Sequence, residues 1–194
     1  MSRRTAESLW WFGMGLAIAA TGIAFASTAA GEDHGHASSP LHTVDKVDLQ
    51  RYLGTWYEIA RYPNRFERNC ASDTTAEYSF CKDGRIEVVN SCRKPSGKTK
   101  SVHGVARVVD PASNAKLKVT FFWPFSGNYW VLALGADYQY AVVGEPSRKY
   151  LWVLSRTPQL APETYRGILN RIEQLGFIPS ELVVTKQGNG KTTI

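Results

Sequence analysis

Tyr52-Leu53-Gly54-Thr55-Trp56-Tyr57-Glu58-Ile59-Ala60-Arg61 is the stretch that decides the fold of this chain. Its aromatic and branched residues predict a strand over about 53–62. Turn signals such as Lys82-Asp83-Gly84-Arg85 punctuate the sequence after it, so each run can pair antiparallel with the next. Seven further runs of this kind follow, at about 73–81, 85–93, 100–109, 115–122, 127–134, 138–144 and 149–156.

An amphipathic helix is predicted after the eighth run, over 161–175, with Gly176 as its stop signal. A short ninth strand is expected at Leu182-Val183-Val184. The predicted fold class is therefore all-β: an eight-stranded antiparallel up-and-down barrel with one C-terminal helix packed outside. Such a barrel has no free sheet edges and is just wide enough to hold one small ligand.

The 194 residues have room for one globular domain with flanking segments. Residues 1–30 combine an early arginine pair, an uncharged run and a small-residue end, which is the layout of a secretory signal peptide. The run is also long enough to span a bilayer if it is not cleaved, and the sequence leaves that alternative open. Residues 31–45 predict a flexible lead, 46–187 the folded domain and 188–194 a polar tail.

The charged residues predict no nucleic-acid partner, and they leave open a weak attraction to anionic lipid head groups. The formal net charge is +6, and Lys and Arg are scattered rather than grouped with aromatic residues, so no nucleic-acid groove is expected. The histidines of the lead, His34, His36 and His42, have no acidic or cysteine partner at a fixed spacing. Neither a metal site nor a cofactor is therefore predicted.

Three short motifs identify a known family. Gly54-Thr55-Trp56 matches the G-x-W signature of lipocalins, Asp137-Tyr138 resembles their second motif, and Arg156 resembles the lone arginine of the third. The motifs occur in the family's order, with the arginine directly before the helix. The chain resembles lipocalins over about residues 45–187, most closely the bacterial outer-membrane lipocalins and the apolipoprotein D-like group.

The resemblance implies a protein that binds and transports or stores a small hydrophobic ligand, such as a fatty acid or a lysophospholipid. It also implies export to the periplasm or outer membrane of a bacterial envelope. Many bacterial members carry a lipid-modified N-terminal cysteine, whereas no cysteine precedes Cys70 here. We therefore expect an exported protein that is soluble rather than lipid-anchored.

The family motifs are expected to close one end of the barrel, which we call the floor. Strand starts alternate between the two ends of an antiparallel meander, so the start of strand one shares an end with the finish of strand eight. Arg156 can then stack on Trp56 as a cation–π pair, worth about 0.5–1 kcal/mol when exposed. Gly54, Trp56, Asp137, Tyr138 and Arg156 are interpreted as structural and not as catalytic residues.

The strand directions also predict at which end of the barrel each of the three cysteines lies. Cys70 follows strand one and Cys92 lies near the finish of strand three, so both are expected at the open end of the barrel, the mouth. Cys81 belongs to the floor end of strand two. Because Cα atoms more than about 7 Å apart cannot be bridged, we predict a Cys70–Cys92 disulfide and a free Cys81.

The ligand-binding residues are predicted from the alternation of side chains along each strand, with Trp56 pointing inward. An inward carboxylate at Glu58 is costly unless it is paired. It therefore either orients a polar head group or is satisfied by a nearby arginine. Core filling is an equal alternative for each inward residue. With Thr74 also inside, the residues expected to line the ligand site are Glu58, Ala60, Ala76, Tyr78, Val88, Asn90, Tyr129, Val131, Tyr150, Trp152 and Leu154.

A loop at the mouth, Phe122-Trp123-Pro124-Phe125-Ser126-Gly127, carries three large aromatic side chains. Exposed apolar groups of this kind mark interaction sites. The segment from Trp123 to Phe125 is expected to touch a membrane surface, to close over the ligand or to bury itself in a homodimer. Folding back onto the barrel is the structural alternative.

No enzyme is predicted. The sequence contains no G-x-S-x-G, H-E-x-x-H, P-loop or G-x-G-x-x-G motif, and His103 is the only histidine of the expected folded part. Two alternatives to the carrier remain. One is a lipid-modifying enzyme on a lipocalin barrel, and the other is a protein-binding envelope module without a ligand.

Overall fold

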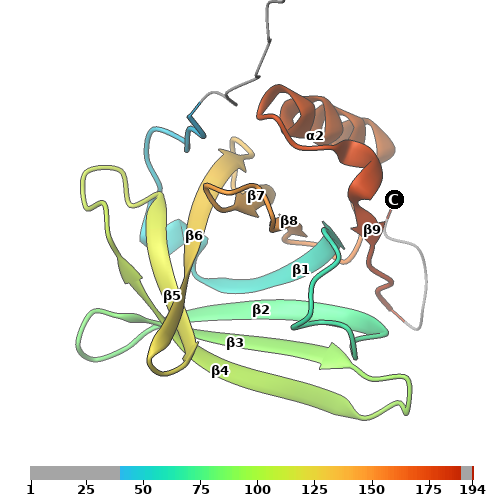
Figure 1. Cartoon of the computed structure of the whole chain (residues 1–194), viewed down its shortest axis with the longest axis horizontal. Coiled ribbons are helices and arrows are strands. Elements are labelled where there is room, and N and C mark those ends of the chain that lie inside the picture. The colour runs from blue at the N-terminus through green and yellow to red at the C-terminus, as the bar shows by residue number, and fades with distance from the viewer. Residues whose placement is uncertain (1–39, 189–193) are drawn as a thin grey trace, which may run out of the picture. The chain divides into compact units, whose positions relative to one another are not determined.

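The computed structural model describes residues 40–188 and 194, which contain an antiparallel β-barrel (Figure 1). Each strand from β1 to β8 pairs antiparallel with the next one in sequence, and β8 pairs back with β1. This closure confirms the predicted fold class. The strands are β1 (Gly54–Arg61), β2 (Ser72–Phe80), β3 (Ile86–Arg93), β4 (Thr99–Val108), β5 (Lys116–Phe122), β6 (Phe125–Leu134), β7 (Tyr140–Gly144) and β8 (Leu151–Ser155).

The first two strands pair with each other only over residues 54–57 of β1. Beyond that point the C-terminal segment enters between them, and β9 (Val183–Val184) pairs with the last two residues of β1. Further along, the Gln187 side chain donates hydrogen bonds of 3.0 and 2.7 Å to the backbone carbonyls of Glu58 and Thr74. The ninth strand and the residues after it therefore fill the seam between β1 and β2.

Helix α2 (Pro162–Gln174) packs on the outside of the barrel and lies at the top of Figure 1, away from β2, β3 and β4. Its buried residues, among them Ile168 and Ile172, form one cluster with outward side chains of β1, β6, β7 and β8. Strand β7 is consequently buried on both faces: Val142 faces the helix cluster, while Val143 belongs to the barrel interior. This explains why its sequence is apolar throughout rather than alternating.

The floor is closed by Trp56 and Arg156. Trp56 is fully buried, and its Nε1 donates a 2.8 Å hydrogen bond to a carbonyl of the short helix α1 (Leu49–Tyr52). The guanidinium carbon of Arg156 lies 3.8 Å from the centroid of the Trp56 ring, as the strand directions predict. Arg156 also donates to the carbonyls of Arg51, at 2.6 Å, and Thr55, at 2.9 Å, so it fastens α1 to the start of β1.

The other motif residues lie at the same end. Gly54 has φ of +87°, a conformation that glycine adopts without strain, and this turns the chain from α1 into β1. The Tyr138 hydroxyl accepts a 2.8 Å hydrogen bond from the backbone N–H of the residue that caps α1, and the Arg51 guanidinium lies 4.3 Å from the Tyr138 ring centroid. Asp137 forms a 3.8 Å ion pair with Arg51 that is largely exposed and therefore adds little stability.

The folded region begins earlier than the sequence predicts. Leu41 is buried in the cluster under α2, and the Val44 N–H donates a 3.0 Å hydrogen bond to the carbonyl of Val131. Residues 40–45 therefore belong to the folded domain, whereas the flexible lead was expected to extend over 31–45. Helix α1 was not predicted, because four residues are too few to show a helical period.

Other boundaries differ by one or two residues: β6 begins at Phe125 rather than 127, and β7 begins at Tyr140 rather than 138. The predicted signal peptide, the first part of the lead with His34 and His36, and residues 189–193 of the predicted tail lie outside the described residues.

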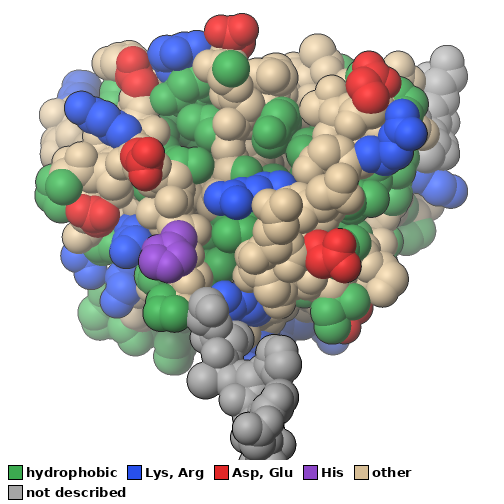
Figure 2. All heavy atoms as spheres, turned by 90° about the horizontal axis from the view of Figure 1, so that it is seen from above, with side chains coloured by type: hydrophobic (Ala, Val, Ile, Leu, Met, Phe, Trp, Pro, Cys, Tyr) green, Lys and Arg blue, Asp and Glu red, His purple; other side chains and the backbone are tan. Residues whose placement is uncertain are grey.

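The surface on the α2 side mixes Lys and Arg with Asp and Glu (Figure 2). Charges on that face are therefore interspersed, as the sequence indicates. Within residues 40–188 and 194, no helix is both long and apolar enough to cross a membrane.

Candidate ligand-binding site

A cavity of about 10 Å³ lies inside the floor half of the barrel. That volume is close to the space that a single water requires. The lining side chains must therefore move apart to admit anything larger. They are apolar apart from three tyrosine hydroxyls, and come from α1, the residues beside it and the strands: Val47, Leu49, Tyr52, Leu53, Tyr78, Ile86, Ala106, Leu117, Val119, Tyr129 and Val131.

The three tyrosines of this cavity meet at their hydroxyl groups. The Tyr129 hydroxyl lies 2.7 Å from that of Tyr52 and 2.9 Å from that of Tyr78. Burial raises the pKa of Tyr78 to about 12, and it raises the pKa of Tyr52 and Tyr129 well above the ordinary value. All three stay protonated at physiological pH. They form a neutral hydrogen-bonding group within an otherwise apolar lining, as is common in pockets for amphipathic molecules.

Charged side chains gather at the other end of β1, near the mouth. Arg61 Nη1 lies 3.1 Å from Glu58 Oε1, and Arg61 Nε lies 3.2 Å from Glu67 Oε2. Trp152 Nε1 donates a 2.9 Å hydrogen bond to Glu67 Oε1, and the Thr185 hydroxyl donates to Glu58 Oε1. One arginine thus serves two nearly buried carboxyl groups.

This arrangement changes the protonation of Glu58. Burial raises its pKa well above the ordinary value, and the neighbouring Glu67 raises it further, while Arg61 and the Thr185 hydroxyl lower it. The two carboxyl groups repel each other when both are ionised, so the cluster holds a proton to higher pH than isolated carboxyl groups do. From the sequence, either a ligand head group or a nearby arginine is expected to satisfy an inward Glu58. In the structure Arg61 is such an arginine.

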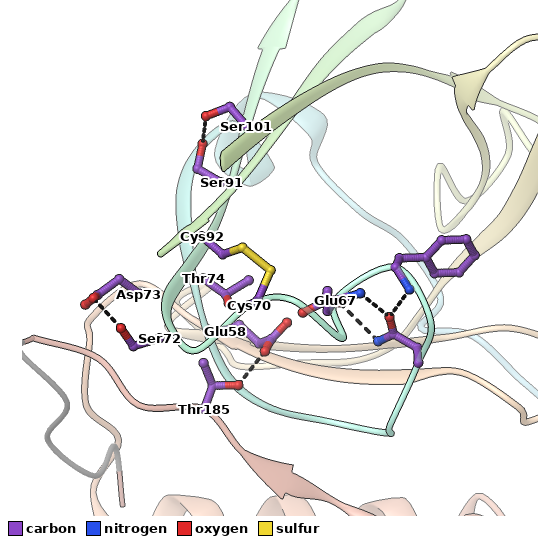
Figure 3. The surroundings of a disulfide bond; sticks show 12 residues. Glu58, Glu67, Cys70, Ser72, Asp73, Thr74, Ser91, Cys92, Ser101 and Thr185 are labelled. Atoms are coloured by element: carbon purple, nitrogen blue, oxygen red, sulfur yellow. Dashed lines mark hydrogen bonds between the residues drawn. A yellow bond between two sulfur atoms is a disulfide. The ribbon is translucent and has the colours of Figure 1, made fainter. Parts of the chain in front are cut away.

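The loop of residues 62–71 is fastened to the wall near this cluster (Figure 3). Cys70 is bonded to Cys92 of β3, with 5.6 Å between their Cα atoms, and Cys81 is a free thiol, so the predicted pairing is confirmed. In the middle of the loop, Glu67 also accepts a 3.1 Å hydrogen bond from the Asn64 side chain. The loop is therefore held both by a covalent bond and by a buried ion pair.

Four buried polar side-chain atoms near the mouth have no hydrogen-bond partner among the described residues. Arg61 Nε and Glu67 Oε2 face each other as the ion pair described above, whereas Thr74 Oγ1 on β2 and Asn90 Oδ1 on β3 have no partner of either kind. Asn90 lies opposite Ala76 in the β2–β3 ladder, and Thr74 lies two residues from Ala76 toward the mouth. A buried polar atom without a partner costs about 1–3 kcal/mol. These two atoms are therefore suited to receive a polar group of a ligand.

Large aromatic side chains stand exposed at the rim of the mouth. Phe122, Trp123 and Phe125, at the turn between β5 and β6, are 70%, 89% and 78% exposed. The alternative that this segment folds back onto the barrel is therefore wrong. On the loop of residues 62–71, the exposed Phe66 lies against Tyr150, with 5.8 Å between ring centroids.

Comparison with known proteins decides the family. The family model described as a lipocalin-like domain matches residues 47–187. The chain belongs to the lipocalin family. This lipocalin is 41% identical over 157 residues to temperature-induced lipocalin-1 of Arabidopsis thaliana, covering 77% of the chain and 84% of that relative.

Bacterial and animal relatives match over a similar span. The lipocalin is 42% identical over 145 residues to the outer membrane lipoprotein Blc of Escherichia coli K12, covering 74% of the chain and 81% of the relative. It is 34% identical over 175 residues to apolipoprotein D of Mus musculus, covering 84% and 89%. Lipocalins bind small hydrophobic ligands and are generally carriers rather than enzymes.

Solved structures share the fold. Insecticyanin from the tobacco hornworm Manduca sexta superposes with a TM-score of 0.62 at 24% identity, covering 79% of this lipocalin and 87% of that chain. Apocrustacyanin C2 superposes with a TM-score of 0.59 at 18% identity, covering 73% and 80%. At these identities the likeness concerns the architecture alone.

The structure brings most of the predicted ligand residues of this lipocalin into the barrel interior. The buried apolar residues of the interior form one cluster, and Tyr129 and Trp152 pack against it. Tyr150 lies at the rim and stacks on Trp152, with 5.9 Å between the ring centroids. Glu58 belongs to the charged cluster near the mouth. Asn90 lies on β3 opposite Ala76, with its buried Oδ1 unpaired. The predicted residues in the interior cluster itself are Ala76, Tyr78, Val88, Val131 and Leu154.

Ala60 is a correction. The sequence places it inside the barrel, but it lies in the cluster under α2. The pairing of β1 with β8 shifts between Glu58 and Ala60, and such an irregularity reverses which side chains point inward. The alternation counted from Trp56 therefore fails after Glu58.

Sequence reasoning missed Ile86, Ala106, Leu117 and Val119 on β3, β4 and β5, and the part of the cavity wall that α1 and its neighbours supply, namely Val47, Leu49, Tyr52 and Leu53. Their apolar character was visible, but four residues of helix carry no periodic signal. Within residues 40–188 and 194, no group of three or more His, Cys, Asp or Glu side chains is placed to hold a metal ion.

Proposed function

We propose that this lipocalin binds one small hydrophobic ligand with a polar end, of the fatty acid or lysophospholipid type, and transports or stores it in the bacterial cell envelope. The observation that carries the proposal is the contrast between the two halves of the interior. The floor half is apolar around the three tyrosines, while the mouth half contains the unpaired Thr74 Oγ1 and Asn90 Oδ1 beside the Glu58 cluster.

In this arrangement the acyl chain lies among the apolar residues of the interior and its polar end lies toward the mouth. Burying each methylene contributes about 0.8 kcal/mol, so a long chain can offset the cost of moving the cavity lining apart. The polar end meets Asn90, Glu58, Tyr150 and Trp152. The acyl chain meets Ala76, Tyr78, Val88, Tyr129, Val131 and Leu154.

Ligand exchange takes place at a lipid surface, which the segment from Trp123 to Phe125 contacts. The high exposure of these aromatic side chains supports contact with lipid, and a homodimer through the same segment is the competing arrangement. Export by residues 1–30 brings the protein to the periplasm or the outer membrane. The layout of those residues and the outer-membrane relatives support that location.

Native mass spectrometry with lipid extraction tests the proposal, on protein expressed with its own export signal. We expect one acyl-chain adduct per chain, released chemically unchanged. Ala76→Phe should exclude the adduct by filling the interior, while Glu77→Phe, on the outward face of the same strand, should retain it. Thermal unfolding of both variants verifies that they fold.

Two outcomes contradict the carrier. An empty barrel that also fails to bind added fatty acids and lysophospholipids favours the protein-binding module. A lipid that is converted on incubation with the protein favours the enzyme.

A further inference from the structure

We infer that the mouth of the barrel docks on an anionic phospholipid bilayer, through a belt of basic side chains around the exposed aromatic turn. The inference rests on the proposed carrier function, because it names the surface at which that site would load and unload.

Four segments meet at the mouth and are called the mouth segments: residues 62–73, 93–100, 122–125 and 145–150. Strand pairing places them at one end, since Ser72 lies opposite Arg93 in the β2–β3 ladder. The Tyr62 N–H also donates a 2.9 Å hydrogen bond to the carbonyl of Leu151, which joins the end of β1 to the start of β8. The antiparallel pairing of β5 with β6 and of β7 with β8 places the turns at 122–125 and 145–150 at the same end of the barrel.

The mouth segments are strongly basic. They contain eight Lys and Arg residues and three carboxylates, which is a net charge of +5. Within the part of the chain that the structure describes, five exposed cations of these segments form no ion pair: Arg65, Arg68, Lys94, Lys98 and Lys149.

The three carboxylates of the mouth segments are already engaged. Glu67 is nearly buried against Arg61, and Asp73 forms a 3.1 Å ion pair with Arg93. Glu145 accepts hydrogen bonds from the backbone N–H groups of Ser147 and Lys149, within its own turn. The outward charge of the mouth is therefore that of its cations.

The floor is different. Its connecting segments, residues 45–53, 81–85, 109–115, 135–139 and 156–161, contain five cations and five carboxylates, so their net charge is zero. The basic character of the mouth is thus a local property and not a reflection of the overall charge of +6.

The aromatic turn lies within this basic end. Phe122 and Phe125 lie opposite each other at the end of the β5–β6 ladder, with the almost fully exposed Trp123 between them in sequence. Aromatic side chains of this kind favour the interfacial region of a bilayer, and basic residues beside them favour anionic head groups. Each cation near such a surface strengthens binding about fivefold. Together they match an anionic bilayer better than a neutral one.

Co-sedimentation of the full chain with vesicles tests the inference. The vesicles are phosphatidylcholine alone, or phosphatidylcholine with about one third phosphatidylglycerol. We expect binding to the anionic vesicles only, and we expect it to weaken as the salt concentration rises.

Two matched variants locate the binding surface. The mouth variant changes Arg68, Lys94, Lys98 and Lys149 to Gln, and we expect it to bind anionic vesicles about six hundredfold more weakly, which is about fivefold for each cation. The control variant changes Lys46, Lys82, Arg107 and Arg166 to Gln, which removes the same charge from exposed positions elsewhere. We expect the control to bind within about twofold of the parent chain.

Native mass spectrometry of the same preparations reports ligand content separately. An empty barrel on a chain that still docks through its basic belt contradicts the proposed function and leaves the docking surface intact. Equal binding to neutral and anionic vesicles, or equal loss in the two variants, overturns the docking inference even if the barrel is loaded. Binding to a co-purified protein in place of vesicles overturns it as well.

Discussion

The floor and the mouth of this barrel are built by the same eight strands but are completed in opposite ways. At the floor, Trp56 is buried, hydrogen-bonded and covered by Arg156, and the charges of the connections balance. At the mouth, Trp123 is exposed to solvent, five exposed cations form no ion pair among the described residues, and the polar atoms of Thr74 and Asn90 lack partners. The side chains of the floor are explained by stability, whereas the exposed and unpaired groups of the mouth fit the contact with a ligand and a lipid surface that we propose.

The strongest test of this contrast is the same substitution at both ends. Trp56→Ala removes a fully buried ring and should lower the free energy of unfolding by about 3–5 kcal/mol. Trp123→Ala removes an exposed ring and should change it by less than about 0.5 kcal/mol. Urea unfolding measures both. Comparable losses at the two positions would show that the mouth is stabilised by packing after all.

The disulfide is the main stabilising link at the mouth. Cys70 and Cys92 are 22 residues apart, and opening a loop of that length should lower the free energy of unfolding by about 3 kcal/mol. Denaturant unfolding of Cys92→Ser tests this, and Cys81→Ser, which removes the free thiol, is the neutral control. If Cys92→Ser unfolds at the parent's denaturant concentration, the bond adds no stability to the mouth.

A smaller effect is expected from the buried carboxyl pair. Because the pKa of Glu58 is raised in the folded state, its stabilising contribution is complete below the unfolded pKa of about 4.3. That contribution is lost as the pH rises through the raised folded value. Glu58→Gln keeps the side chain neutral, so stability should fall less with rising pH than in the parent chain.

Unfolding free energies measured at several pH values between mildly acidic and mildly alkaline conditions check this, with the exposed Glu77→Gln as control. Parallel pH profiles for Glu58→Gln and the parent would mean that Glu58 is ionised throughout and fully paired by Arg61.

The smallest effect on stability is expected at the aromatic turn. Substitutions there should change the rate at which the ligand is exchanged with a membrane. The double variant Trp123→Ser with Phe125→Ser should slow transfer of a fluorescent fatty acid between protein and vesicles, while unfolding stays within about 0.5 kcal/mol of the parent. Phe80→Ser, an aromatic that is 41% exposed at the floor end of β2, should leave transfer unchanged. Unaltered transfer in the double variant would reject a role of the turn in lipid contact.

Features that depend on short sequence patterns and on strand order were predictable. The eight strands follow from alternating runs and turn signals, and the contact between Trp56 and Arg156 follows from strand direction. The Cys70–Cys92 bond follows from the same reasoning, since only those two cysteines share an end.

Features that depend on distant packing were not predictable. A single irregularity in β1 was enough to move Ala60 from the interior to the helix side, and nothing in the residue types marks it. The burial of Leu41 and the hydrogen bond from Val44 depend on segments far along the chain. The sequence did not distinguish an exposed Trp123 from one packed against the barrel, because the same residue type occurs in both environments.

The seam between β1 and β2 gives the order of synthesis a physical meaning. The end of β1 pairs with β9, and Gln187 bridges Glu58 and Thr74, so the first strand of the barrel is completed by residues that are synthesised after all the other strands. Until those residues leave the ribosome, the first strand keeps an open edge and the barrel wall has a gap. The barrel wall of this protein therefore closes only after residues 183–187 are available to fold, which places the completion of the barrel late in the synthesis of the domain.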